Sequence, residues 1–332
     1  MIPTSNQLVT VFGGSGFVGR HVVRALARRG YRIRVAVRRP DLALFLQPLG
    51  RVGQIHPVQA NLRFPASVAS AIAGADAVVN LVGILSEGGN QTFTAVQADG
   101  ARAVAEATAA AGITRLVQMS ALGSDPDSES DYARTKAAGE AAAFASVPEA
   151  VVLRPSIVFG PEDQFFNRFA ALARMSPVLP LVGGGETRFQ PVFVGDVAEM
   201  VCRAIDGTIR TGVVYECGGP EVKTFRQILE YVLAVTGRKR LLAPLPFGAA
   251  NIQAGVLEFI DKISLGLLPD ALKLTRDQVR LLQVDNVVSD AAKAEGRTLE
   301  GVGLTPELIE AVVPSYLYRF RARGQFDASK FA

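Results

Sequence analysis

The stretch "QLVTVFGGSGFVG", residues 7–19, decides the fold. Its apolar run ends in glycine, and Gly13, Gly16 and Gly19 follow at intervals of three. Glycines between a strand and a helix let the backbone approach a pyrophosphate, and the N-terminus of the helix supplies free N–H groups and a positive dipole. The spacing alone is a weak signal. Directly after the first strand of a βαβ unit, it predicts a dinucleotide-binding loop.

The segments after this loop alternate between helix and strand patterns up to about residue 160. "GFVGRHVVRALARRG" has apolar residues at helical spacing, and "YRIRVAVRR" alternates with a period of two. Further strands are expected in "QIHPVQANL", "ADAVVNLVG", "TRLVQMS" and "AVVLRPSIVFG", with helices in "ARAVAEATAAAG" and "YARTKAAGEAAAFA". Strands separated by helices predict an α/β fold with a doubly wound, parallel Rossmann sheet.

Beyond residue 160 the alternation loosens and the chain becomes mainly helical. A strand is expected in "GVVYECGG" and a helix in "KTFRQILEYVLAVTG", before a long apolar stretch broken by Pro and Gly. We therefore place a Rossmann domain that binds the cofactor in residues 1–160 and a smaller, mainly helical lobe in residues 161–332. Some strands of this lobe are expected to return to the main sheet, and the lobe is the expected docking surface.

Composition excludes several classes of protein. Apolar residues make up 49% of the 332 and mean hydropathy is +0.25, but no run approaches the roughly 18 to 20 apolar residues of a membrane span. The start, "MIPTSNQLVT", has no basic segment before an apolar run, so no secretory signal is expected. A net charge of +4 without basic runs argues against nucleic-acid binding. It suits an acidic partner or anionic lipid heads.

The rare residue types argue against a metal site. Cys202 and Cys217 are the only cysteines, lie far from any metal-ligand spacing, and suit a reducing cytoplasm. His21 and His56 are the only histidines, and ordinary surface or packing roles are expected for both. A zinc site or a histidine-based triad is therefore not expected.

The end of the second strand, "VAVRRPD", indicates which dinucleotide is bound. This position meets the adenine ribose, where an acidic residue favours NAD. Arg38 and Arg39 stand there instead, and guanidinium groups pair with a 2′-phosphate, which favours NADP. A solvated basic turn is the plainer alternative. Two further strand ends are expected to line the cofactor, through Asn61 and Leu62 of "ANLR" and Val82 and Gly83 of "NLVGIL".

The stretch "DYARTKAAGE", residues 131–140, holds the candidate chemistry. Tyr132 and Lys136 are four residues apart, which places them on one face of a helix. A free tyrosine titrates near about 10, so a nearby cation is needed for it to move a proton at neutral pH. The pair can also hold a ribose without any turnover.

These motifs together resemble the extended or atypical short-chain dehydrogenase/reductase superfamily. The residues that carry the resemblance are GGSGFVG, NLVG, Ser120, Tyr132 with Lys136, "LRPSIVFGP" and "FVGDVAEM". In active members the lysine holds the nicotinamide ribose and a Ser or Thr hydroxyl completes the site. Many extended members place this hydroxyl third in a run that closes the fifth strand. Here the run is Ser120-Ala121-Leu122, and Ser120 and Ser124 stand in the wrong register to replace it.

A narrower resemblance covers roughly residues 7 to 320. "NLVGILSEGG", "PEAVVLRPSIVFGPEDQFFNRFA", "PLVGGGETRFQPVFVGDVA" and the stretch from "LTRDQVRLLQVDNVVS" to "YLYRF" are similar to the Rossmann-type accessory subunit of respiratory complex I (NADH:ubiquinone oxidoreductase) and its bacterial relatives. This resemblance implies a tightly held NADPH with a structural role on the peripheral arm, near the membrane. It implies a place on the cytoplasmic face of a bacterial inner membrane, or on the matrix side of a mitochondrial one.

The resemblance also completes the expected site. Tyr132 and Lys136 become a remnant pair that binds cofactor, with no catalytic residue and no metal. The full cofactor-binding set is Gly13, Gly16, Phe17, Val18, Gly19, Arg38, Arg39, Asn61, Leu62, Val82, Gly83, Ser120, Tyr132, Lys136, Pro155 and Ile157. The partners expected are other complex I subunits of the peripheral arm, with contact to the membrane surface through the C-terminal lobe. Two alternatives stay open: a free NADP-dependent oxidoreductase or epimerase, and an NADP-sensing regulator.

Overall fold

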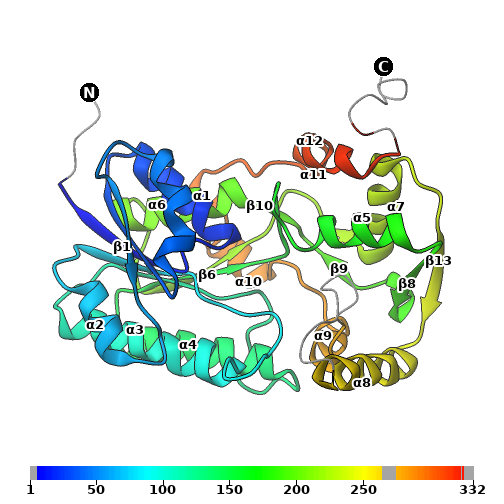
Figure 1. Ribbon diagram of the computed structural model, residues 1–332, viewed down its shortest axis with the longest axis horizontal. Helices are drawn as coiled ribbons and strands as arrows, with labels where there is room; N and C mark the ends of the chain where they lie inside the picture. The colour runs from blue at the N-terminus through cyan, green and yellow to red at the C-terminus, as the bar shows by residue number, and fades with distance from the viewer. Residues whose placement is uncertain (1–5, 264–273, 323, 325–332) are drawn as a thin grey trace. The chain divides into compact units, whose positions relative to one another are not determined.

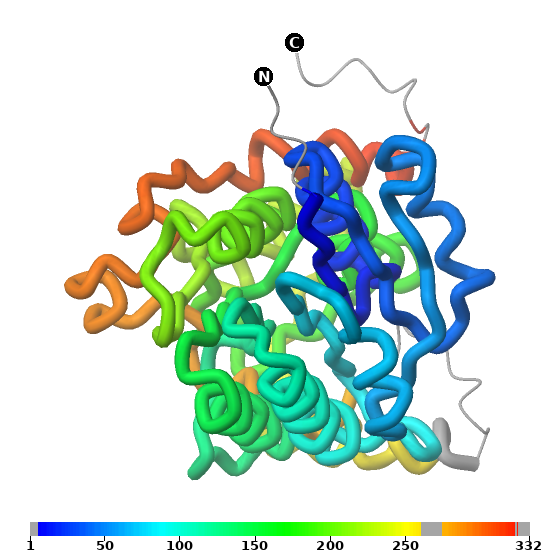
Figure 2. The backbone as a smooth tube through the Cα atoms, turned by 90° about the vertical axis from the view of Figure 1, so that its left-hand side faces the viewer, coloured from blue at the N-terminus to red at the C-terminus, as the bar shows by residue number. Residues whose placement is uncertain are grey.

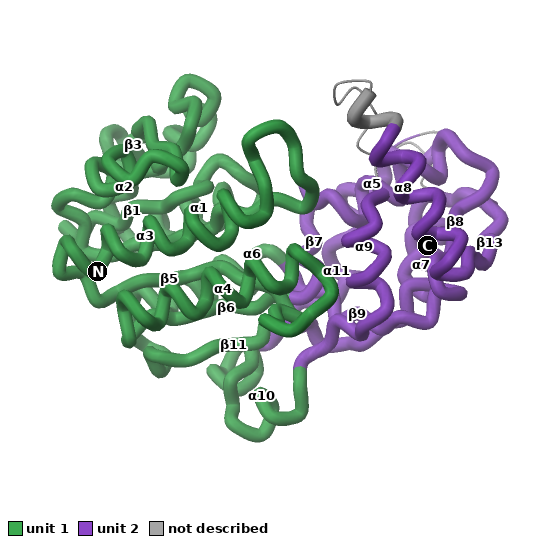
Figure 3. Tube along the Cα trace, turned by 90° about the horizontal axis from the view of Figure 1, so that it is seen from below, with its two compact units in different colours: residues 1–155, 194–217, 289–304 green, residues 156–193, 218–288, 305–332 purple. Residues whose placement is uncertain are grey.

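The chain forms two compact units that alternate along the sequence. The computed structural model describes residues 6–263, 274–322 and 324. Unit 1 holds the chain up to Pro155 together with Val194–Cys217 and Ser289–Leu304, and unit 2 holds Ser156–Phe193, Gly218–Val288 and the chain from Thr305 (Figure 3). The chain therefore first leaves unit 1 close to the expected boundary and then returns to it twice. The assignment of residues 1–160 as the cofactor-binding domain and of residues 161–332 as the docking lobe stays a prediction, and residues 325–332 lie outside the described residues.

Unit 1 is built on the expected parallel sheet. Seven strands lie in the order β11-β6-β5-β4-β1-β2-β3, and every neighbouring pair is parallel. The strands are β1 (Leu8–Phe12), β2 (Arg32–Val37), β3 (Ile55–Gln59), β4 (Ala77–Asn80), β5 (Leu116–Met119), β6 (Val151–Pro155) and β11 (Val213–Cys217). The order reverses between β1 and β4, and ligands of such sheets bind beyond the carboxyl ends of the strands at that point. The α/β doubly wound prediction is confirmed.

Helices cover both faces of this sheet (Figure 1). α1 (Phe17–Arg28) and α6 (Val194–Asp206) pack together on one face, and α2 (Pro65–Ile72), α3 (Asp99–Ala110) and α4 (Asp131–Ser146) follow one another on the other. Shorter pieces complete the unit: η1 (Pro40–Leu49), η2 (Thr94–Ala98), α10 (Asp290–Ala294) and η5 (Glu300–Val302). α1 buries Val22, Val23 and Leu26 against the sheet, which fixes the direction in which its N-terminus points.

Unit 2 combines helices with short strand pairs. Its strands form three two-stranded sheets, β10 (Val192–Phe193) with β7 (Val158–Phe159), β12 (Lys223–Thr224) with β9 (Arg188–Phe189), and β13 (Leu241–Leu245) with β8 (Val178–Val182). The helices are α5 (Phe166–Met175), η3 (Gly183–Gly185), α7 (Phe225–Thr236), α8 (Phe247–Ile263), α9 (Arg276–Leu281), α11 (Ile309–Val312), α12 (Pro314–Leu317) and η6 (Tyr318–Phe320). Phe159, Phe166 and Phe225 lie in its apolar core.

Within the described ranges, none of the helices combines the length and the apolar character that a membrane crossing requires.

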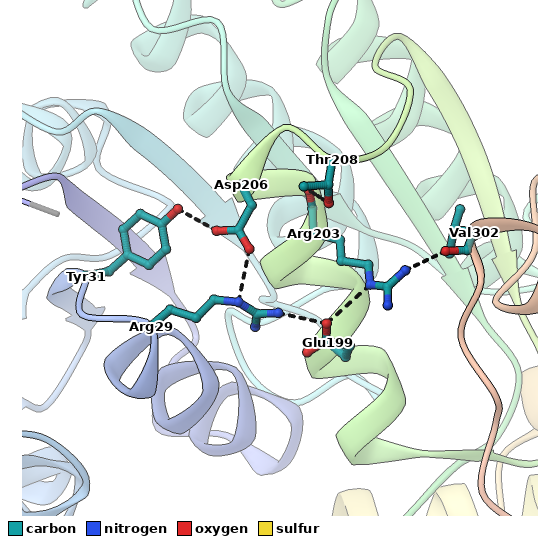
Figure 4. A network of polar contacts seen from close by, with 7 residues as sticks. All are labelled: Arg29, Tyr31, Glu199, Arg203, Asp206, Thr208 and Val302. Atoms are coloured by element: carbon teal, nitrogen blue, oxygen red, sulfur yellow. Dashed lines mark hydrogen bonds and ion pairs between the residues drawn. The ribbon is translucent and has the colours of Figure 1, made fainter. Parts of the chain in front are cut away.

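A polar network ties α6 to the first βαβ segment of unit 1 (Figure 4). The Arg29 guanidinium donates to Glu199 at 2.7 Å and lies 3.0 Å from Asp206, while the Tyr31 hydroxyl donates to Asp206 at 2.6 Å. Arg203 bonds the same Glu199 carboxylate at 3.2 Å and reaches the Val302 carbonyl. Burial and the neighbouring Asp206 raise the pKa of Tyr31, so its hydroxyl stays a donor. The segment from Val194 is thereby fastened to unit 1.

Tyr31→Phe should lower the free energy of unfolding by about 1 kcal/mol, the usual contribution of one such hydrogen bond, because Asp206 loses a donor. Urea unfolding at neutral pH measures the change. Tyr318→Phe is the matched control, since Tyr318 is 38% exposed. Equal stability of Tyr31→Phe and wild type would mean that the bond from Tyr31 to Asp206 does not stabilise the fold.

Candidate nucleotide-binding site

The glycine loop between β1 and α1 is closed so tightly that side chains are excluded. Gly13 has a φ of +76°, and a Cβ on Gly19 would lie 2.2 Å from the Gly13 carbonyl oxygen and 2.6 Å from the Gly14 Cα. A Cβ on Gly14 would lie 2.8 Å from Val35. Gly16 differs, because its Cβ would meet only the Gly13 oxygen, at 3.3 Å. Gly13, Gly14 and Gly19 are therefore needed for the loop itself, whereas Gly16 is exposed and leaves space for a ligand.

The N-terminus of α1 is suited to an anion. The helix begins at Phe17, with Gly16 as its cap residue, no side chain bonds the cap, and no acid lies in the first turn. The backbone N–H groups of the first turn, which include those of Phe17 and Val18, have no partner inside an α-helix. Free N–H groups and the positive end of the helix dipole favour a phosphate. The predicted pyrophosphate loop thus has the required form.

The two arginines after β2 differ in their surroundings. Both are exposed, but Arg39 is bonded through two nitrogens to the Asp41 carboxylate, at 3.0 and 2.8 Å. Arg38 pairs with no carboxylate among the described residues. Arg38 is therefore the better placed to meet a 2′-phosphate, and Arg39 would have to leave Asp41 to do so. Sequence alone gave no sign of this pairing beyond the nearness of Asp41.

The residues predicted to line the cofactor after β3 and β4 already contact other parts of the protein. The Asn61 side-chain oxygen accepts from the Arg63 N–H at 3.2 Å, and Leu62 packs on Gly100 of α3. Val82 lies beside the glycine loop, since a Cβ on Gly13 would be 3.2 Å from its side chain. Val82 therefore forms a wall of the loop, while Asn61 and Leu62 first stabilise their own turn.

Lys136 brings three predicted residues together. A Cβ on Gly83 would lie 3.1 Å from the Lys136 ammonium, which also donates to the Met119 carbonyl at 3.4 Å. The ammonium is 5.8 Å from the centre of the Tyr132 ring, and that ring packs edge-on against Phe93. Tyr132 and Lys136 do share one face of α4, as the spacing predicts. Burial lowers the pKa of Lys136 to about 8, against a smaller opposing effect of Glu140.

The Ser120 hydroxyl is already hydrogen-bonded to other side chains of the protein. It donates to the Glu140 carboxylate and lies 2.9 Å from the Ser124 hydroxyl, and all three side chains are buried. Arg154 of β6 holds the same carboxylate through two bonds, at 2.8 and 2.6 Å. A hydroxyl has one hydrogen to donate. Ser120 therefore has none left for a substrate carbonyl, and Leu122, which ends the run, is buried and apolar.

Sequence reasoning missed Glu140, although the signal was present. Tyr132, Lys136 and Glu140 follow one another at intervals of four, so all three lie on one face of α4. Gln97 was also missed: its side-chain nitrogen donates to the Ile84 carbonyl at 3.0 Å, and its oxygen is a buried side-chain atom without a partner among the described residues. Gln97 lies in η2, a turn of π-helix, a form found often near functional sites. No pattern in the sequence predicts that turn.

The last two predicted residues fall in different units. Pro155 ends β6, and its carbonyl accepts from the Leu122 N–H at 3.0 Å, so it fixes the segment after β5. Ile157 belongs to unit 2, where its carbonyl accepts from Val192 and its side chain packs on the core of that unit. Unit 1 thus holds every predicted cofactor residue except Ile157.

Unit 2 has a surface hollow of its own. It measures about 580 Å³ and is lined by Glu221, Val222, Lys223, Gln227, Glu230 and Tyr231. Lys223 already pairs with Glu221 at 2.6 Å and with Glu310 at 3.1 Å. Because its one cation is neutralised, the hollow offers little to an anionic nucleotide, and the glycine loop of unit 1 remains the candidate site.

The Rossmann sheet, the glycine loop and the Tyr–Lys helix define a nucleotide-binding protein of the short-chain dehydrogenase type. The chain belongs to the NAD dependent epimerase/dehydratase family, whose pattern matches residues 9–218.

Within this family the chain is similar to two named relatives. It is 33% identical over 328 residues to the Arabidopsis thaliana protein named NADH dehydrogenase [ubiquinone] 1 alpha subcomplex subunit 9, mitochondrial, covering 96% of this chain and 79% of the relative. It is 34% identical over 301 residues to the ceramide reductase of Caulobacter vibrioides, covering 89% and 90%. An NADPH-dependent quinone oxidoreductase from Escherichia coli shares the fold, with a TM-score of 0.71 and 20% identity over 93% of this chain and 99% of the other.

Gly83→Ala should weaken nucleotide binding roughly fivefold, or about 1 kcal/mol, because the new methyl displaces the Lys136 ammonium by a few tenths of an ångström. Calorimetric titration with NADPH measures the change. Gly88→Ala is the matched control, since no atom would contact a Cβ there. If both variants bind equally well, Lys136 does not contact the nucleotide.

Proposed function

We propose that this protein is a non-catalytic accessory subunit of respiratory complex I that holds NADPH to support assembly and stability of the peripheral arm. The proposal rests on one combination of features. The glycine loop has the geometry of a nucleotide-binding loop, and the Ser120 hydroxyl donates its hydrogen to Glu140. Bound NADPH would supply a hydride donor. Without a hydroxyl to orient a carbonyl, the protein uses the nucleotide as a structural element instead.

The residues of unit 1 divide the task of holding the nucleotide. The glycine loop and the first turn of α1 bind the pyrophosphate, and Arg38 meets the 2′-phosphate. Lys136 donates to the hydroxyls of the nicotinamide ribose, and Tyr132 lies beside it. Val82 and Gly83 line the site between the glycine loop and Lys136.

The place in complex I is supported by the names of relatives. The subunit 9 proteins of Arabidopsis thaliana and Mus musculus both match across 96% of this chain. The peripheral location proposed is the cytoplasmic face of a bacterial inner membrane, or the matrix side in a mitochondrion, beside other subunits of the peripheral arm. Contact of the C-terminal lobe with the membrane surface is supported by α8, where Ile252, Val256 and Phe259 are 71%, 52% and 64% exposed at helical spacing.

Purified protein should carry NADP(H) rather than NAD(H), and Arg38→Ala should reduce its affinity for NADPH roughly ten- to a hundredfold, because a charge-assisted bond contributes about 1.5 to 3 kcal/mol. Arg39→Ala should have a smaller effect, since Arg39 is held by Asp41. Chromatography of the extracted nucleotide and titration of the variants measure both. Predominant NAD(H), or equal affinities of Arg38→Ala and wild type, would contradict the assignment.

A second candidate function is a free NADPH-dependent reductase of a lipid-like or quinone-like carbonyl. The observations that favour it are the intact Tyr132–Lys136 pair and the 34% identity to a ceramide reductase. The isolated protein can be screened with NADPH against ketone derivatives of sphingolipids, quinones and sugar nucleotides. Turnover above about one per second, abolished in Tyr132→Phe, would establish this function and refute the structural role.

A further inference from the structure

Positive charge is concentrated at the start of unit 1. Residues 1–75 contain ten arginines, no lysine, and Asp41 as the only acid, whereas the remaining 257 residues contain 25 basic and 30 acidic side chains. The first βαβ segment therefore carries a charge of +9 and the rest of the chain −5. Such an asymmetry indicates a partner of opposite charge more strongly than the modest net charge of the whole chain does.

Some of these arginines already form ion pairs or hydrogen bonds within the protein. Arg29 pairs with Glu199 and Asp206, Arg34 donates to the carbonyls of Ala71 and Ala73, and Arg39 pairs with Asp41. The exposed Arg24 and Arg28 are different, because neither pairs with a carboxylate among the described residues. They follow Arg20 at intervals of four along α1, so the three lie on one helix face.

Large apolar side chains lie next to this row of arginines. η1 packs against α1, and the Arg20 guanidinium lies 5.1 Å from the centre of the Phe45 ring. Ala43 and Leu46 of η1 are fully buried, while Leu42, Leu44 and Phe45 are 65%, 53% and 47% exposed. The blue stretches of α1 and η1 run beside one another in Figure 2. We call this surface the arginine face, and define it by Arg20, Arg24, Arg28, Leu42, Leu44 and Phe45.

We propose that the arginine face is a docking surface for an acidic face of another protein subunit, an inference that rests on the proposed role within a larger assembly. Protein interfaces are enriched in arginine and depleted in lysine, as this segment is, and the exposed ring of Phe45 lies within the arginine face. Guanidinium groups bind carboxylates through two parallel bonds, whereas an anionic lipid surface attracts lysine equally well. The absence of lysine from residues 1–75 therefore favours a protein over a membrane.

The test compares Arg24→Glu with Arg28→Glu, made together, and a matched pair, Arg115→Glu with Lys239→Glu. The matched residues are exposed, undergo the same change of charge and lie outside the arginine face. The full-length tagged chain is expressed in its host, and membranes are extracted. The fraction of chain that migrates with NADH:quinone oxidoreductase activity on a native gel is measured, together with the nucleotide content of each variant.

The Arg24/Arg28 pair should reduce that fraction at least roughly tenfold, with unchanged nucleotide content, and the matched pair should not. Raising the salt concentration should release wild type, because exposed charge pairs are screened. Co-migration of the Arg24/Arg28 variant equal to wild type would overturn the proposal. A vesicle assay gives a second contradicting outcome. If the purified protein binds phosphatidylcholine vesicles only when they contain phosphatidylglycerol, and the Arg24/Arg28 changes abolish this binding, a lipid is the partner and the proposal is wrong.

A second measurement separates this proposal from the complex I role. A photo-crosslinking residue in place of Leu44 should link, in living cells, to a peptide of another protein that is rich in Asp and Glu. If wild type does not migrate with the oxidoreductase activity, the complex I role fails, but such a crosslink would keep the docking surface. If neither co-migration nor an acidic crosslink is found, the arginine face is not an interface.

Discussion

Gly16→Val is expected to empty the nucleotide site and to lower the stability of the protein as purified by about 4 kcal/mol. This is the stabilisation that a ligand gives at 1,000 times its dissociation constant when it binds only the folded state. The valine side chain would stand over the N-terminus of α1, where we propose that the pyrophosphate binds. It would leave the empty protein folded, because a Cβ at Gly16 meets one atom, at 3.3 Å.

Two comparisons make this result specific. Gly19→Val should damage the fold itself, since its Cβ would collide with the Gly13 and Gly14 backbone. Gly248→Val should change neither property, because nothing lies within 4 Å of a Cβ there. Thermal unfolding with and without added NADPH, together with chromatography of the extracted nucleotide, distinguishes the three variants. If Gly16→Val keeps its nucleotide and its melting temperature, the loop does not bind the pyrophosphate.

Lys136→Met should have opposite effects on stability and binding. The pKa of Lys136 is lowered to about 8 by burial, from 10.5. The folded state therefore carries a penalty for the buried ammonium that is fully present below pH 8 and disappears as pH rises towards 10.5. Removing the charge should stabilise the nucleotide-free protein by up to roughly 3 kcal/mol at neutral pH, and by little at about pH 10. NADPH affinity should fall at least roughly tenfold, because a charge-assisted donor is lost.

Urea unfolding of nucleotide-free protein at both pH values and calorimetric titration with NADPH check these effects. Lys239→Met, at an exposed lysine, is the control and should change neither. Tyr132→Phe should leave affinity nearly unchanged. A Lys136→Met variant that is less stable than wild type at neutral pH would contradict this account, because the bond from Lys136 to the Met119 carbonyl would then outweigh the cost of burying the ammonium.

The sequence predicted those features that depend on local pattern. The seven strands of the sheet, the glycine loop and the shared face of Tyr132 and Lys136 follow from apolar periodicity and residue spacing. The run Ser120-Ala121-Leu122 also predicted an incomplete catalytic site, because a leucine at its third position cannot replace a hydroxyl.

The features that depend on distant segments were missed. Arg154 of β6 meets Glu140 of α4 because the fold packs these two elements together. The Gln97 oxygen, which has no partner among the described residues, lies in a π-helical turn that no residue pattern predicts. The return of strands from the C-terminal lobe to the main sheet was expected, and β11 pairs with β6 at the edge of that sheet, but the sequence did not indicate which strand returns or that the chain enters unit 1 a third time. Arg39 and Asp41 are close in the sequence, but whether their side chains pair depends on the rotamers they adopt, which the sequence does not predict.

Native mass spectrometry of the protein extracted gently from membranes tests the central claim most directly. We predict one assembly that contains this chain with subunits of NADH:quinone oxidoreductase, and a mass for the released chain that includes one NADP(H). A free chain, or an oligomer of this chain alone, that reduces a carbonyl with NADPH would contradict the account.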